Sequence, residues 1–73
     1  MKKTKKVYTP EEINKFRLFF SHEAREILTD LGEFDDDVEN GIREVLQWSD
    51  KRVLREIKSS LDSKDIMFVL SDF

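Results

Sequence analysis

The chain has 73 residues, which is the length of one small domain, and the absence of cysteine excludes disulfides, thiolate metal sites and thiol nucleophiles. Charged residues make up 40% of the chain, yet the net charge is only −3, so the placement of the charges matters more than their sum. Hydrophobic residues make up 38% and include six Phe, which excludes a disordered chain and predicts a folded one.

The first eight residues form a basic segment that contains Lys2, Lys3, Lys5 and Lys6. No apolar stretch follows it, so it does not read as a secretion signal. No apolar run approaches the roughly 20 residues that a membrane span needs. We therefore expect a single cytoplasmic domain over residues 1–73, with residues 1–8 as a short basic tail.

A first helix is predicted over about residues 10–31. Thr9 is suited to the N-cap, Pro10 to the first helical position and Glu12 to the reciprocal bond of a capping box. Gly32 is suited to the left-handed residue that ends a helix. Apolar residues recur at intervals of three and four and predict one buried stripe: Ile13, Phe16, Phe20, Ala24, Ile27 and Leu31.

A second helix follows the polar link at residues 33–37, where the aspartates are expected to cap it and to complement its positive end. Val38, Ile42, Val45 and Leu46 provide its apolar stripe. Gly41 lies inside this helix, where glycine costs about 1 kcal/mol relative to alanine. We expect that Gly41 allows a neighbouring element to approach closely.

A third helix is predicted after Ser49, which is suited to its N-cap, with Trp48 placed to pack onto Val53. Val53, Leu54, Ile57 and Leu61 form its stripe. The C-terminal run of residues 66–70 is compatible with a short fourth helix capped by Ser63 or with a strand. We favour the helix, because only the segment around Lys5–Tyr8 could pair with a lone strand.

The predicted fold is therefore all-α, a bundle of three helices with a short C-terminal helix, the alternative being a C-terminal strand. Its expected core is Phe16, Phe20, Ile27, Ile42, Leu46, Trp48, Ile57 and Leu61.

Known catalytic and metal-binding patterns are incomplete in this chain. His22 is the sole histidine and follows Ser21 directly, so the two point about 100° apart on a helix and cannot form a nucleophile–base pair. Glu26 stands where a zinc-protease motif begun at His22 would need its second histidine. A calcium loop begun at Asp35 would need glycine and glutamate where Asn40 and Leu46 stand. We expect no enzyme activity, no cofactor and no metal site.

A group of carboxylates surrounds Phe34, and it is the first of two candidate binding surfaces. Carboxylates around an exposed aromatic residue suit a basic partner surface, such as the nucleic-acid groove of an enzyme, although the same residues also serve as helix-start signals. Leu18 lies about 140° from Ile13 on the helix wheel and could add an apolar contact. The predicted protein-binding residues are Glu33, Phe34, Asp35, Asp36, Asp37, Glu39 and Leu18.

The second candidate surface is basic and would bind nucleic acid through phosphate contacts. Lys51, Arg55 and Lys58 share one face of the third helix, with Arg52 nearby. The overall negative charge and the lack of a helix-turn-helix glycine between the second and third helices count against this alternative.

Residues 34–61 contain the stretches Asp-Asp-Val-Glu-Asn-Gly-Ile-Arg-Glu-Val-Leu-Gln-Trp-Ser and Val-Leu-Arg-Glu-Ile-Lys-Ser-Ser-Leu. This segment resembles the helical hairpin of small immunity proteins from bacterial contact-dependent toxin systems. The resemblance implies binding and neutralising a cognate toxin, and a phage-encoded inhibitor of a host enzyme would show the same features. The sequence thus predicts a protein-binding inhibitor, with a nucleic-acid-binding accessory protein as the alternative and self-association third.

Overall fold

The first helix of the computed structural model, which describes residues 8–73, is α1 (Pro10–Asp30). The predicted capping box is present: the Thr9 hydroxyl accepts a hydrogen bond from the Glu12 amide at 3.1 Å, and the Glu12 carboxylate accepts one from the Thr9 amide at 2.9 Å. At the other end Gly32 adopts φ +82°. Its amide donates to the Thr29 carbonyl at 3.0 Å, which closes the helix as the sequence predicts.

The second helix, α2 (Asp35–Leu46), begins differently from the prediction. Its N-cap is Phe34, and no side chain caps it. Asp35, Asp36 and Asp37 occupy its first turn instead, where they complement the positive end of the helix dipole without satisfying a free amide. The prediction that aspartates cap this helix is therefore wrong, because the chain enters α2 one residue before the first of them.

The last two helices are α3 (Asp50–Ser60) and α4 (Ser63–Asp72). Ser49 caps α3 as predicted, its hydroxyl accepting from the Arg52 amide at 3.2 Å. The C-terminal run is helical, so the strand alternative is wrong. Asp62 rather than Ser63 caps α4, through a capping box with Asp65 that satisfies free amides of the first turn.

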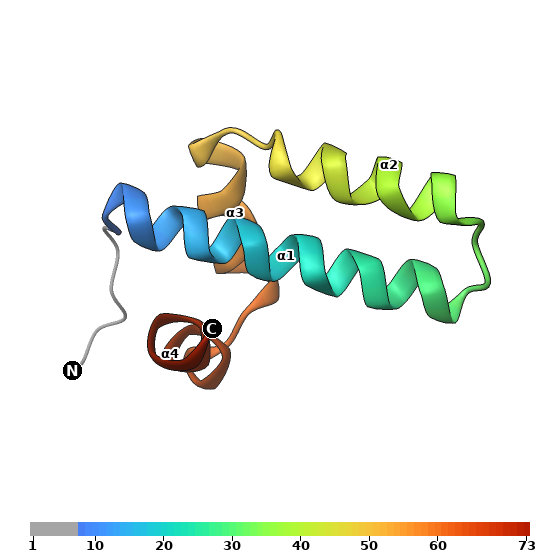
Figure 1. The fold of residues 1–73 in the computed structure, drawn as a ribbon. Coiled ribbons are helices and arrows are strands. Elements are labelled where there is room, and N and C mark those ends of the chain that lie inside the picture. The colour runs from blue at the N-terminus through green and yellow to red at the C-terminus, as the bar shows by residue number, and fades with distance from the viewer. Residues whose placement is uncertain (1–7) are drawn as a thin grey trace.

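All described residues in regular structure are thus helical, as predicted, and residues 8–73 contain four helices and no strand. Helix α1 is the longest element and packs mainly against α2, which runs back alongside it (Figure 1). Helices α3 and α4 lie against the N-terminal half of α1. The α1–α2 hairpin therefore extends beyond the rest of the bundle. The basic tail residues Lys2, Lys3, Lys5 and Lys6 lie outside the described residues.

The core lies where α1, α3 and α4 meet. Its buried cluster consists of Ile13, Phe16, Val53, Ile57 and Val69, with Phe20, Trp48 and Leu61 half-buried against it. Four members of the predicted stripes are instead exposed: Ile27 (57%), Leu31 (69%), Leu46 (42%) and Leu54 (36%). Their prediction as buried residues is wrong. On α1, α3 and α4 cover only the N-terminal half and leave Ile27 and Leu31 open. Leu46 is the last residue of α2, and Leu54 lies about 100° around α3 from the buried Val53.

Two basic side chains of α1 bind residues of α3, of α4 and of the link that precedes α3. The Arg17 guanidinium donates to the Trp48 carbonyl at 3.1 Å and forms a 2.6 Å salt bridge with Asp50, the first residue of α3. The Lys15 ammonium donates to the Leu70 carbonyl of α4 at 3.2 Å. None of the helices in the described range is both long enough and apolar enough to traverse a lipid bilayer.

Candidate binding surfaces

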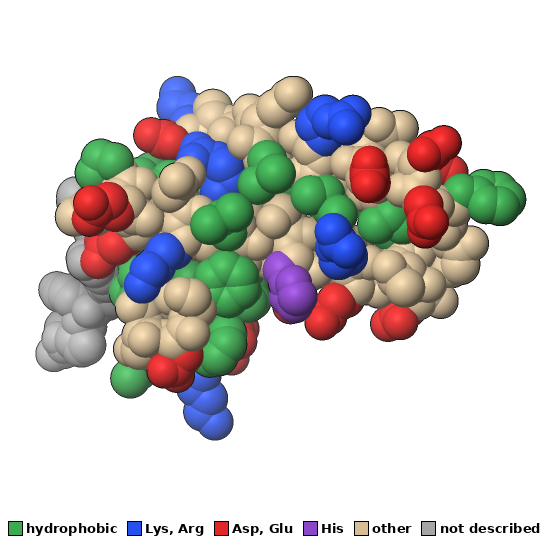
Figure 2. Space-filling view, in the orientation of Figure 1, with side chains coloured by type: hydrophobic (Ala, Val, Ile, Leu, Met, Phe, Trp, Pro, Cys, Tyr) green, Lys and Arg blue, Asp and Glu red, His purple; other side chains and the backbone are tan. Residues whose placement is uncertain are grey.

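The carboxylates predicted as a binding surface lie together at the far end of the α1–α2 hairpin. We call Glu33, Asp35, Asp36, Asp37 and Glu39 the acidic strip. All five are exposed, and none forms a salt bridge or a side-chain hydrogen bond with a residue of the described range. Figure 2 shows acidic side chains gathered around this end of the molecule. The strip is therefore a solvated, uncompensated patch of negative charge.

Phe34 lies within the strip and is 79% exposed. It is the N-cap residue of α2, and its backbone carbonyl accepts a hydrogen bond from the Val38 amide at 3.0 Å. Its ring is absent from the buried core. An aromatic ring left in water adds nothing to the stability of the fold through burial, so helix capping and packing leave the identity of this side chain unexplained.

Helix stability does not account for all of the negative charge here. Residues 23–39 contain eight carboxylates and one basic residue, Arg25. Asp35, Asp36 and Asp37 are favourable at the start of α2, whereas Asp30 and Glu33 lie at the negative end of α1, which has no basic residue in its last turn. The dipole of α1 therefore opposes the charges of Asp30 and Glu33, and helix stability does not explain their presence.

Leu18 does not belong to this surface. It is 49% exposed, as the helix wheel predicts, but it precedes the end of α1 by more than three turns, which is roughly 20 Å along the axis. The structure therefore separates Leu18 from the acidic strip, with which the sequence analysis had grouped it.

The basic face of α3 is smaller than predicted. Lys51, Arg55 and Lys58 are exposed and form no ion pair with a residue of the described range, so these three cations are available to a ligand. The Arg52 guanidinium lies 4.4 Å from the centre of the Trp48 ring and forms a 3.3 Å salt bridge with Glu56. Arg52 is thus engaged within the fold and is less free to contact phosphate.

His22 lies on the exposed side of α1. Its Nε2 atom is 3.3 Å from a Glu26 carboxylate oxygen, and its ring faces Phe73 at 6.3 Å between centroids. Over residues 8–73, no three side chains of His, Cys, Asp or Glu converge in a way that could hold a metal ion.

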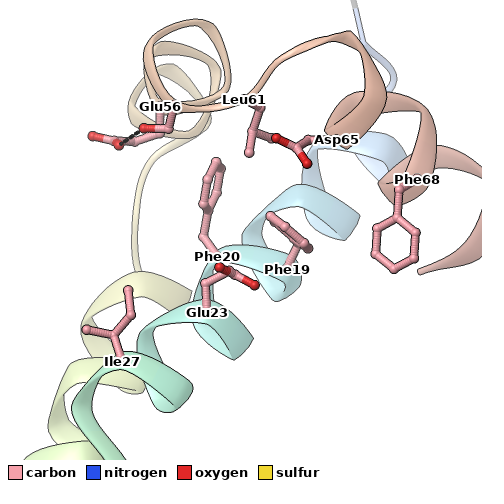
Figure 3. Close-up of a pocket in the computed structure, with 9 residues that line it drawn as sticks. Phe19, Phe20, Glu23, Ile27, Glu56, Leu61, Asp65 and Phe68 are labelled. Atoms are coloured by element: carbon pink, nitrogen blue, oxygen red, sulfur yellow. Dashed lines mark hydrogen bonds between the residues drawn. The ribbon is translucent and has the colours of Figure 1, made fainter. Parts of the chain in front are cut away.

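The structure also contains an open groove of about 600 Å³ between α1, α3 and α4, which the sequence analysis missed. Figure 3 shows Phe19 and Phe20 pointing from α1 towards Leu61, with Phe68 on α4 at one side. The sequence feature that could have indicated this groove is the apolar stripe of α1, which extends beyond the part that α3 and α4 cover. The groove is lined by Phe19, Phe20, Glu23, Ile27, Glu56, Ser60, Leu61, Asp65 and Phe68.

Comparisons with protein-family models, with curated proteins and with solved structures give no match for this chain.

Proposed function

We propose that the protein binds another protein through the acidic strip and Phe34, and that this contact inhibits or neutralises the partner. One observation carries the proposal: five exposed carboxylates, none paired with a cation of the described residues, flank Phe34, whose ring is 79% exposed and lies outside the buried core. A cluster of one sign of charge around an apolar anchor is typical of a binding surface for a partner of the opposite charge.

The strip and the ring contribute in different ways. The carboxylates attract a basic surface over a distance of about one Debye length, which is about 8 Å at physiological ionic strength, and so they raise the association rate. Phe34 acts after the encounter, because its ring loses contact with water once it enters a pocket of the partner. Charge thus sets the speed and orientation of binding, and the ring slows dissociation.

Inhibition follows if the basic surface of the partner is one that the partner uses. Enzymes that act on nucleic acids hold the phosphate backbone with lysines and arginines. The acidic strip would occupy those cations in place of phosphates and exclude the substrate. Neutralisation of a toxin enzyme, which the resemblance of residues 34–61 to immunity proteins implies, is one case of this mechanism.

The test is affinity capture of the tagged protein from its native cells after nuclease treatment, followed by mass spectrometry. Three variants are compared with the wild type: Asp35→Lys with Asp37→Lys, Phe34→Ala, and Arg55→Glu with Lys58→Glu. The third is the matched control, since it reverses two charges on a different helix. Circular dichroism confirms that each variant is helical before capture.

We expect the first two variants to lose a basic protein that the wild type and the control retain. Addition of the purified protein should then inhibit that partner's activity. Capture of the same protein by the strip variant would contradict the proposal.

A second candidate function is nucleic-acid binding. It is favoured by Lys51, Arg55 and Lys58, which are exposed and unpaired among residues 8–73. If the protein binds nucleic acid, the variant used above as a control should be the one that loses its ligand. Arg55→Glu with Lys58→Glu should then abolish retention of DNA or RNA and reduce the salt dependence of the affinity. The strip variant should then bind nucleic acid at least as well as the wild type, because it carries less negative charge.

A further inference from the structure

The groove between α1, α3 and α4 has an apolar floor. Phe19 and Phe20 of α1 lie beside each other, with 5.8 Å between ring centroids, and Phe68 of α4 faces Phe19 at 6.4 Å. Leu61, in the link between α3 and α4, closes the floor (Figure 3). Phe68 is 47% exposed, so part of this aromatic surface is in water.

The floor continues along α1 beyond the point where α3 and α4 end. Ile27 lines the groove and is 57% exposed, and Leu31, one turn farther, is 69% exposed. These residues continue the helical stripe of Phe16, which is fully buried, and Phe20, which is half-buried. Over about the last two turns of α1, its apolar stripe is therefore not covered by another helix of the described residues.

The charged side chains that line this groove are all acidic. Glu23 of α1, Glu56 of α3 and Asp65 of α4 line it, and no lysine or arginine among the described residues does so. Glu56 is paired with Arg52, whereas Glu23 and Asp65 have no cation within salt-bridge distance in the described range. An occupant that brings positive charge to the rim and apolar side chains to the floor would complement both features.

We propose that this groove binds a basic amphipathic helix of a partner protein. It is a surface separate from the acidic strip, and its occupation does not depend on the function proposed for that strip. The occupant's apolar stripe would lie on Phe20, Ile27 and Phe68, in place of the helix that the stripe of α1 lacks. Its lysines or arginines would face Glu23 and Asp65.

A helix fits this site better than an extended strand. The groove is walled by helices in the described range, so there is no sheet edge whose backbone groups could pair with a strand. Phe20 and Ile27 are seven residues apart on α1, which is two turns and about 10 Å. Apolar residues at positions i, i+3, i+4 and i+7 of a bound helix would span that distance.

The probe is a fluorescein-labelled peptide of leucine and lysine, patterned as an amphipathic helix of about four turns, with a second peptide carrying glutamate in place of every lysine. Fluorescence anisotropy measures the affinity of each for the full chain. The groove variants are Phe68→Lys and Ile27→Lys. Their control is Met67→Lys, because Met67 neighbours Phe68 and is 66% exposed but does not line the groove.

We expect the lysine peptide to bind and the glutamate peptide to fail. Phe68→Lys and Ile27→Lys should each weaken binding by about tenfold or more, because each removes apolar contact and adds a like charge, while Met67→Lys should leave it within about threefold. Glu23→Lys should weaken binding more than the control Glu44→Lys on α2. Asp35→Lys with Asp37→Lys should leave groove binding within about threefold, which separates this site from the acidic strip.

Three results would overturn the proposal: no binding of the lysine peptide, equal binding of both peptides, or equal effects of Met67→Lys and the groove variants. Sedimentation of the unliganded protein supplies a further check. A dimer that Phe68→Lys and Ile27→Lys dissociate would show that a second copy covers the groove, and it too would overturn the proposal. Because Phe68 and Ile27 are exposed on different helices, misfolding of one variant leaves the other as the test.

Discussion

Gly41 of α2 and Leu28 of α1 lie so close that a Cβ atom on Gly41 would be 2.6 Å from the Leu28 Cδ1 atom. The absence of a side chain at Gly41 is what lets α2 approach α1 at this level. Together with the buried Val38 and Val45 of α2, this close approach packs the hairpin that carries the acidic strip. It confirms the role that the sequence predicts for a glycine inside a helix.

The Gly41 contact gives a prediction in the form of a double-mutant cycle. Gly41→Ala should change the free energy of unfolding by less than about 1 kcal/mol, because a gain of similar size in helix propensity opposes the displacement of Leu28. In a Leu28→Ala background the clash is gone, so Gly41→Ala should stabilise the protein by about 1 kcal/mol. Urea denaturation followed by circular dichroism measures both values. Equal effects in the two backgrounds would show that the contact does not constrain the hairpin.

Loss of the Thr9 cap should destabilise the protein by about 1 kcal/mol. Thr9→Ala leaves the Glu12 amide without the hydroxyl that now accepts its hydrogen bond. Thr9→Ser retains a hydroxyl and should remain close to the wild type. The same denaturation experiment distinguishes them, and an equally stable Thr9→Ala protein would mean that the start of α1 is frayed in solution.

The two halves of the α1 stripe should respond differently to truncation. Phe16 is fully buried, so Phe16→Ala should cost about 3–5 kcal/mol. Leu31 is 69% exposed, and Leu31→Ala should change stability by less than about 0.5 kcal/mol. Trp48 is half-buried, so Trp48→Ala should fall between them, at about 2 kcal/mol. A large cost for Leu31→Ala would mean that the far half of α1 is covered in solution.

The acidic strip should be nearly dispensable for folding. No side chain caps α2, so the combined change of Asp35, Asp36 and Asp37 to Asn removes only their interaction with the helix dipole. Relief of repulsion between neighbouring carboxylates opposes that loss. We expect a net change below about 1 kcal/mol in thermal denaturation at low salt. A larger loss would indicate that these residues are retained for stability rather than for binding.

Local signals in the sequence predicted the helices well. Helices begin at Thr9 and Ser49 and end at Gly32 through hydrogen bonds to residues three or four positions away. Their neighbours along the chain therefore suffice to identify them. Phe34 is the exception, because it occupies an N-cap without a capping side chain and so displaces the predicted role of the aspartates.

Features that depend on distant segments could not be predicted in the same way. Ile27 and Leu31 share the periodicity of Phe16, and only the positions of α3 and α4 decide which of them is buried. The groove likewise combines side chains of three helices. The exposure of the acidic strip was predictable from its composition, and its separation from Leu18 was predictable from the length of the first helix.

The proposed function requires that the acidic strip drives association with a basic partner. The most direct measurement is the association rate of the captured partner with the wild type and with the Asp35→Lys and Asp37→Lys variant, at low and at physiological ionic strength. The wild-type rate should fall steeply with salt, and the variant should associate slowly with little salt dependence. Equal rates with equal salt dependence for the two proteins would contradict it.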